Sequence, residues 1–401
     1  MEPAATQSQS PIGLILTGGG ARAAYQVGVL QAIAALLAEY GHYGPSPFKV
    51  VCGTSAGAIN ATALASRSDN FEEAVFRIGD IWENFRAEQV YRADSLGVIR
   101  TGAKWLTALS FGWMLRKRPK SLLDNSPLVD LLHKMIDLPR LDECLEYGHL
   151  RALAVTASSY SSGYHVTFYQ TLQQIQPWIR TQRLAQPDQI TIQHLLASAA
   201  IPFVFPSIPL AFNNRREFFG DGSMRQLAPI SPAIHLGASK VLVIGAGQMR
   251  DSSTLASDTP LPHASYPSLA QIAGHALSSI FLDSLAMDIE RLTRVNHTIR
   301  LLPPEVQQRS ALRSVDVLVI APSERLDYIA AKHVAALPAP VRLLLGGIGA
   351  TEQRGSALAS YLLFEAAYTQ ELMALGRSDT LARKSEVLDF FDLEPAVQVV
   401  E

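Results

Sequence analysis

The sequence predicts a layered α/β fold with a central sheet of mostly parallel strands. Short apolar runs alternate with helix-like segments through the first half of the chain, which is typical of α/β layers. Two of these runs end in glycine-rich turns that lead into helices, as parallel strand–helix units do. The chain has 401 residues, of which 48% are hydrophobic and 17% are charged, so it can bury a large core.

The first four elements follow a strand–helix–strand–helix order. The run IGLILT (12–17) predicts a buried strand, and the residues after it carry apolar side chains at helical spacing as far as Gly41. FKVVCG (48–53) predicts a second buried strand, and the small residues of 56–65 predict the next helix. In a parallel sheet, the carboxyl ends of these two strands open on one crevice.

The later elements are predicted in the same way. The segment 188–200 predicts a helix that Pro202 ends, because proline cannot continue a helix. Residues 251–267 predict a loop rich in Ser, Pro and Ala, and residues 357–375 predict a helical stretch that is amphipathic throughout. Five more apolar runs predict strands: 152–157, 164–169, 216–220, 240–246 and 315–321.

This organisation predicts two parts. We expect a core domain at 10–325 and a helical C-terminal extension at 326–401. Packing on the core is the favoured role of the extension, and a cap or a partner-binding helix set is the alternative. The sequence leaves the oligomeric state open.

Composition limits the partners and the compartment. The formal net charge of −2 gives no electrostatic reason to bind nucleic acid. Two cysteines make no disulfide framework, which favours a reducing, cytoplasmic location. The N-terminus has no basic region of the kind that begins a signal peptide. No stretch approaches the roughly 20 apolar residues that span a bilayer, so we expect any membrane contact to be peripheral.

The first glycine turn, GGGARA (18–23), formally fits a dinucleotide-binding pattern. That interpretation also needs an acidic residue at the end of the second strand, about 20 positions on, to hold the ribose. Glu39 has this spacing, but it lies at the end of the predicted helix. The Gly-Lys-Ser/Thr of a phosphate-binding loop is missing too. Nucleotide binding is therefore disfavoured.

The second turn, GTSAG (53–57), has the Gly-x-Ser-x-Gly pattern of a nucleophile elbow. It follows an apolar strand and opens a helix, which is the setting that this motif requires. Gly53 and Gly57 leave room where strand and helix approach closely, and Ser55 would stand at the helix N-terminus. A serine that merely caps the helix is the alternative, and this motif alone does not decide between the two.

An acyl-transfer serine needs backbone N–H donors aimed at the developing oxyanion. Gly18, Gly19 and Gly20 begin another helix at the end of the adjacent strand and have unencumbered N–H groups. Arg22 either adds positive charge near this site or faces solvent from the helix.

The serine also needs a general base. The histidines that would complete a triad have no persuasive local setting, and the same holds for His165 and His194. Asp221, between two glycines in REFFGDGS, has a carboxylate with little steric cover, although an Asp-Gly turn is the alternative. The triad candidates are His235, His263, His275, His297 and His333.

These motifs together resemble the patatin-like phospholipase family. The likeness extends over roughly 12–300 and also includes ASAAIPFVFPSI (197–208) and SPAIHLGASKVLVI (231–244). It implies a three-layer α/β/α fold, with Gly18, Gly19, Gly20, Ala21 and Arg22 as the oxyanion turn, Gly53 and Gly57 as the elbow glycines, and no cofactor or metal. It further implies a dyad in which Ser55 is the nucleophile and Asp221 the general base. Ser223 departs from the pattern, because the family more often has glycine or alanine there.

The resemblance implies lipid acyl hydrolysis on phospholipids, lysophospholipids or simpler fatty-acyl esters. An esterase or thioesterase that acts on small soluble substrates is one alternative. A non-catalytic protein that binds lipid or nucleotide and keeps the glycine turns is another.

The segment 96–123 mixes aromatic and basic side chains. This composition fits an interfacial segment or lid that contacts a membrane surface, and a packed helix followed by a charged loop is the alternative. The residues concerned are Lys104, Trp105, Phe111, Trp113, Met114, Arg116, Lys117, Arg118 and Lys120.

Overall fold

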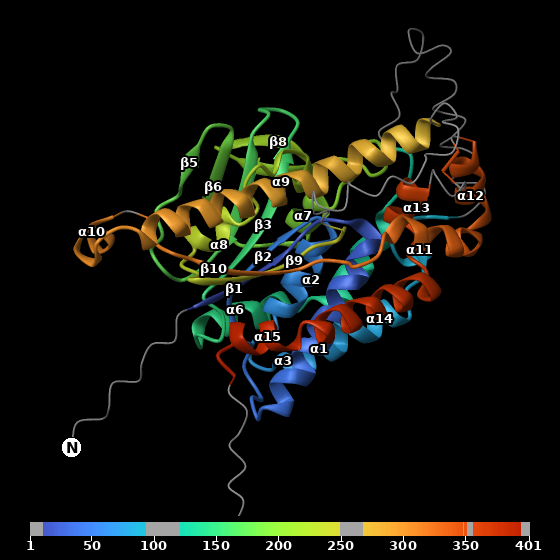
Figure 1. Cartoon of the computed structure of the whole chain (residues 1–401). Helices are drawn as coiled ribbons and strands as arrows, with labels where there is room; N and C mark the ends of the chain where they lie inside the picture. Colours follow the sequence, from blue (N-terminus) through green and yellow to red (C-terminus); the bar gives the residue numbers. More distant parts are fainter. Residues whose placement is uncertain are drawn as a thin grey trace, which may run out of the picture.

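A computed structural model describes residues 11–93, 121–248, 268–310, 312–347, 349–350 and 356–393. The predicted loop at 251–267 lies outside these ranges, and so does nearly all of the proposed lid at 96–123. Figure 1 shows the arrangement of the elements.

A single mixed sheet forms the centre of the molecule (Figure 1). Five neighbouring strands are parallel, in the order β10 (Asp316–Ile320), β9 (Lys240–Ile244), β1 (Ile12–Leu16), β2 (Phe48–Thr54) and β3 (Ala152–Ser159). The sheet then continues through β4 (His165–Gln170), β6 (Arg183–Pro187) and β5 (Ile179–Arg180), with β4 antiparallel to β3. A hairpin of β7 (Ile208–Phe212) and β8 (Arg215–Asp221) joins the sheet at β3.

Helices cover both faces of the sheet. Leu14 and Leu16 of β1 point into one core cluster and Ile15 points into the other, because side chains alternate along a strand. The first cluster packs under α1 (Ala24–Glu39), α2 (Ala56–Ala65), α3 (Phe71–Glu83) and α14 (Ala366–Ala382). The second packs under α8 (Ser231–His235) and α9 (Leu269–Arg300) (Figure 1). The three-layer α/β/α fold with a helical C-terminal region is thereby confirmed.

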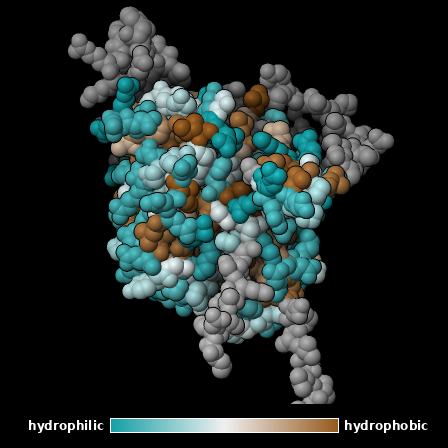
Figure 2. All heavy atoms as spheres, turned by 90° about the vertical axis from the view of Figure 1, so that its left-hand side faces the viewer, coloured by the Kyte–Doolittle hydropathy of each residue, from teal (hydrophilic) through white to brown (hydrophobic). Residues whose placement is uncertain are grey.

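Shorter helices complete the described part of the chain. They are α5 (Ser126–Met135), α6 (Leu138–Glu146), α7 (Ile192–Ser198), α10 (Pro304–Arg309), α11 (Leu326–His333), α12 (Ala339–Gly346), α13 (Ser356–Leu362) and α15 (Lys384–Phe390). On the face that Figure 2 shows, hydrophobic residues form separate patches among hydrophilic ones, in keeping with an apolar majority that packs inside.

All seven predicted strands are present, but β5, β6 and β7 were not anticipated. The helix predicted at 188–200 is the shorter α7, which ends before Pro202. The prediction of one amphipathic stretch at 357–375 was wrong. The chain bends at Leu363–Glu365 between α13 and α14. At this bend the side chains of Leu363 and Phe364 are buried in the core, and the carboxylate of Glu365 accepts a hydrogen bond from the backbone N–H of Ala87.

One expectation about membranes also needs correction. The helical stretch Gly20–Glu39 is long and apolar enough to cross a bilayer by length and composition. In the structure 83% of its apolar window is buried inside the protein, which is how a core helix passes the same test. The close packing of α1 against α14 and α3 accounts for its apolar sequence.

The C-terminal helix α14 lies along α1 at very short range. A Cβ atom at Gly28 would come within 2.0 Å of the carbonyl oxygen of Met373, so only glycine fits there. The Tyr25 hydroxyl donates a 2.9 Å hydrogen bond to Asp379. The C-terminal helices therefore share a core with the rest of the chain, and the boundary between 325 and 326 stays a prediction.

Candidate active site

Ser55 occupies a strained turn between β2 and α2. Its φ of 56° and ψ of −131° lie in a region that residues with a side chain rarely adopt. The backbone N–H of Ser55 donates to Oγ of Ser198 at 2.8 Å, and that hydroxyl donates to the carbonyl of Thr156 at 2.6 Å. Ser198 thus ties the turn to β3, a contact that the sequence analysis missed.

The two glycines of the elbow lie where backbones cross. A Cβ atom at Gly53 would come within 2.4 Å of the Cα of Ala58. One at Gly57 would come within 2.3 Å of the carbonyl oxygen of Leu16 and 2.5 Å of that of Thr17. Helix α2 can therefore approach β1 and β2 closely only because both positions are glycine.

The strand register brings Asp221 beside Ser55. β2 ends where Thr54 pairs with Thr156, and the next residue of β3, Ala157, pairs with Asp221 at the end of β8. Strand β3 pairs with β4 along one edge over its length. Strand β8 therefore pairs with β3 on the same edge as β2, beyond the point where β2 ends. The carboxylate of Asp221 therefore lies just beyond the carboxyl end of β2, where the elbow begins.

Ser55 and Asp221 are in direct contact. The serine hydroxyl donates to Oδ2 of Asp221 at 2.6 Å, and Oδ1 accepts the backbone N–H of Ser223 at 2.9 Å. Burial raises the pKa of Asp221 to about 6, against these hydrogen bonds, which lower it. Such a carboxylate is ionised at neutral pH and is a stronger base than an exposed aspartate, so it can accept the serine proton.

The first glycine turn borders an apolar pocket beside Ser55. Gly20, with a φ of 56°, lines this pocket together with Ser55. The N–H groups of Gly18, Gly19 and Gly20 have no hydrogen-bond partner among the described residues, whereas the N–H of Arg22 donates to the carbonyl of Gly19 at 3.1 Å. Ala21 is fully buried. The turn therefore has backbone donors to offer to a ligand, and the N–H of Arg22 is not one of them.

The side chain of Arg22 contradicts one of the two expectations from the sequence. It is 4% exposed, so it does not face solvent. Its Nε donates to Oγ of Ser360 at 2.7 Å, and its guanidinium lies 4.1 Å from the ring centre of Tyr361. Arg22 thus binds α13, and its charge is directed to the C-terminal helices.

Three of the candidate histidines have structural partners. His194 caps α7 at Thr191, His235 stacks on Trp178 with ring centres 4.6 Å apart, and His333 pairs with Glu371. His165 is buried in β4, and His275 and His297 lie on α9, while His263 falls outside the described residues. Within the described ranges no histidine forms a hydrogen bond with Ser55 or Asp221.

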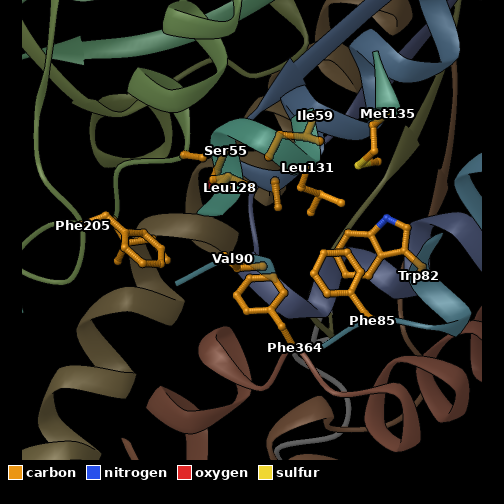
Figure 3. A pocket seen from close by; sticks show the side chains of 14 residues that line it. Ser55, Ile59, Trp82, Phe85, Val90, Leu128, Leu131, Met135, Phe205 and Phe364 are labelled. Carbon is orange, nitrogen blue, oxygen red and sulfur yellow. The ribbon is translucent and has the colours of Figure 1, made fainter. Parts of the chain in front are cut away.

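An apolar pocket adjoins Ser55 (Figure 3). Apart from Gly20 and Ser55, the described residues that line it have hydrophobic side chains. Figure 3 shows rings from several helices and loops facing this space. The lining residues are Gly20, Ser55, Ala56, Ile59, Trp82, Phe85, Val90, Leu128, Leu131, Met135, Ala199, Ile201, Phe205 and Phe364.

A buried hydrogen-bond network centred on Asn60 holds one wall of the pocket in place. Asn60 donates to the carbonyl of Ala23 and to the side chain of Gln26, both at 3.2 Å, and it accepts from the indole N–H of Trp82 at 2.9 Å. The network joins α1, α2 and α3 and fixes the Trp82 ring in the pocket wall. The sequence offered no signal for it beyond a polar residue in an apolar helix.

The structure bears on two other sequence hypotheses. Glu39 forms surface hydrogen bonds with Lys384 at the far end of α1, away from the glycine turns, so it is not placed to hold a ribose there as a dinucleotide site requires. Among the described residues no three His, Cys, Asp or Glu side chains gather as metal ligands.

Two solved structures are similar to this chain at low sequence identity. VipD from Legionella pneumophila is 15% identical, over 92% of this chain and 69% of its own, with a TM-score of 0.32. The human GIVD cytosolic phospholipase A2, solved with methyl gamma-linolenyl fluorophosphonate, is 14% identical, over 98% of this chain, with a TM-score of 0.39. This chain spans 61% of the human enzyme's length.

A comparison with curated protein sequences gave no match. A family model described as "Patatin-like phospholipase" matches residues 14–234, which is more than half of the chain. The matched region contains both glycine turns, Ser55 and Asp221. The protein therefore belongs to the patatin-like phospholipase family.

Proposed function

We propose that this protein is a lipid acyl hydrolase of the phospholipase A or lysophospholipase type, with Ser55 as nucleophile and Asp221 as general base. The 2.6 Å hydrogen bond between these two buried side chains, at the edge of an apolar pocket, carries the proposal. Membership in the patatin-like phospholipase family supports hydrolysis of lipid esters.

The reaction begins when Oγ of Ser55 attacks the ester carbonyl while Asp221 accepts the hydroxyl proton. The carbonyl oxygen becomes negative, and the N–H groups of Gly18, Gly19 and Gly20, which have no partner among the described residues, would stabilise it. The C–O bond of the ester then breaks, and Asp221 returns its proton to the leaving alcohol. Water attacks the acyl-enzyme with Asp221 again as base, which releases the fatty acid and restores Ser55.

The pocket lining indicates which part of the lipid enters. Among the described residues it contains no charged side chain, so this lining suits a hydrocarbon chain better than a phosphate or an ammonium group. The acyl chain would lie inside the pocket and the alcohol part of the lipid outside it. We further propose a cytoplasmic protein that meets lipid surfaces peripherally, with 96–123 as the contact segment.

Covalent labelling tests the nucleophile. An alkyl fluorophosphonate is expected to add one phosphonyl group to the protein, and peptide mass spectrometry should find it on Ser55. Ser198, 2.8 Å from the Ser55 nitrogen but bound to Thr156, is an internal control that should stay unmodified. The absence of an adduct, or an adduct elsewhere, would favour a non-catalytic lipid-binding protein. Hydrolysis of short soluble esters without any activity on phospholipid vesicles would favour the esterase alternative.

The pH dependence of kcat/KM tests the base. Only the ionised carboxylate can accept a proton, and burial raises the pKa of Asp221 to about 6. We expect kcat/KM for an uncharged ester to be constant above this pH and to fall about tenfold per pH unit below it. Circular dichroism at each pH checks that the protein remains folded. A profile without an acid limb between pH 5 and pH 7 would mean that Asp221 is not the base.

A further inference from the structure

One wall of the pocket comes from beyond the region that the family model matches. Thirteen of the 14 described residues that line it lie within 14–234, and the remaining one is Phe364. Figure 3 shows its ring rising from the C-terminal part of the chain towards Val90 and Phe85. The described part of the matched region therefore leaves the pocket open on this side.

The ring of Phe364 belongs to an aromatic group. Its centre lies 5.5 Å from that of Phe85 and 6.4 Å from those of Trp82 and Tyr91. Phe364 is 6% exposed. Aromatic side chains packed in this way have little freedom to move aside, so the ring forms a fixed boundary of the cavity.

The backbone around Phe364 is held on both sides. The Tyr91 hydroxyl donates to the carbonyl of Leu362 at 2.9 Å, and the carboxylate of Glu365 accepts the backbone N–H of Ala87 at 3.2 Å. Both partners lie in the loop that follows α3, which also supplies Phe85 and Val90 to the pocket. The bend between α13 and α14 is thus held by hydrogen bonds to the same loop that supplies Phe85 and Val90 to the pocket.

Helix α13, which leads into this bend, also contacts the glycine turn. A Cβ atom at Gly20 would come within 2.3 Å of the carbonyl oxygen of Tyr361, so the α13 backbone packs directly on the turn. Arg22 reinforces this contact through Ser360 and the Tyr361 ring. Phe364 is therefore placed by a segment that contacts both the proposed oxyanion donors and the acyl pocket.

We propose that Phe364 determines the length of acyl chain that this site accepts, an inference that rests on the acyl-binding function proposed above. The ring occupies space that further methylene groups would need, so longer chains are rejected by overlap. Truncation of the ring leaves an apolar cavity continuous with the pocket, which additional methylenes can fill. The C-terminal helices would then act as a specificity element of the active site.

The experiment measures kcat/KM of Phe364→Ala and of the wild type for esters of decanoate, tetradecanoate and octadecanoate. We expect the ratio of the longest to the shortest chain to rise by about tenfold or more in the variant, since single methylenes are discriminated to that degree in apolar pockets. Phe364→Leu should give an intermediate ratio, and it replaces the alanine variant if that one fails to fold. The matched control is Phe390→Ala, which removes an 8% exposed ring that does not line the pocket.

The same variants are also tested for binding of the free fatty acids by calorimetry, which needs no hydrolysis. A shift of affinity towards octadecanoate in Phe364→Ala would support the role of the ring even if the wild type hydrolysed nothing, and the proposed activity alone would then fail. An unchanged chain-length profile in both assays would overturn the role of Phe364. An equal shift in Phe390→Ala would overturn it too, because general loosening of the C-terminal helices would then be the cause.

Discussion

Asp221→Asn is expected to lower kcat by about a thousandfold or more, to the level of Ser55→Ala. The asparagine keeps the shape of the site but cannot accept the serine proton. Its amide can donate to Oγ of Ser55 and its oxygen can accept the N–H of Ser223, so both contacts of the aspartate are retained in form. The double variant should be no worse than either single one, because the two residues act as a unit. Steady-state kinetics on one lipid ester measures all three.

Loss of activity in Asp221→Asn should not come from unfolding. The folded pKa of Asp221 is about 6 and its ordinary value is 3.8, so between these values the folded state binds more protons than the unfolded state. Stability of the wild type therefore falls as pH rises through this window, by roughly 3 kcal/mol in total. Asparagine does not titrate, and the variant should unfold at a higher temperature than the wild type at pH 7 but not below pH 4.

Histidine variants provide the opposite expectation. His235→Ala and His275→Ala should retain most of the activity, and so should His263→Ala, whose position lies outside the described residues. His235 stacks on Trp178 and makes no contact with the dyad. If one of these variants were as inactive as Ser55→Ala, the base would be a histidine and the role of Asp221 would be wrong.

Local sequence patterns predicted the parts of the site that depend on local geometry. An apolar run followed by glycines and a helical segment identifies a strand–turn–helix unit, so the turns at 18–23 and 53–57 could be located without a structure. The helix at 56–65 even has the predicted ends. Asp221 depended on the family resemblance, because an aspartate between glycines is also an ordinary turn.

Contacts between distant segments could not be predicted. Ser198 supports Ser55 across 143 positions, and Arg22 meets Ser360 across 338. Nothing local distinguishes Ser198 from other serines or Arg22 from a solvent-facing arginine. In the sequence, Phe364 is likewise one apolar residue among many in a predicted helical segment. Its side chain lines the pocket only because the chain bends between α13 and α14. The topology of the fold decides these roles, and the topology cannot be derived from the local patterns of a single sequence.

Gly57→Ala is expected to destabilise the protein by about 3 kcal/mol and to abolish most of its activity. The added methyl group would come within 2.3 Å of the carbonyl oxygen of Leu16 and 2.5 Å of that of Thr17. Both obstacles are backbone atoms of β1 and its extension, so neither can rotate away as a side chain would. Relief requires α2 to move off the sheet, and that movement would carry Ser55 away from Asp221. Thermal unfolding and kcat measure the two effects.

Gly347→Ala is the matched control for this change. Gly347 also has helical backbone angles, with φ of −60° and ψ of −22°, but a Cβ atom there would lie 3.5 Å from its nearest neighbour, which is ordinary contact. Alanine is favoured over glycine in helices by about 1 kcal/mol, a preference that acts in the same direction at both positions. The difference between the two variants therefore isolates the clash. If Gly57→Ala were as stable and active as Gly347→Ala, the close approach of α2 to β1 would not be what holds Ser55 against Asp221.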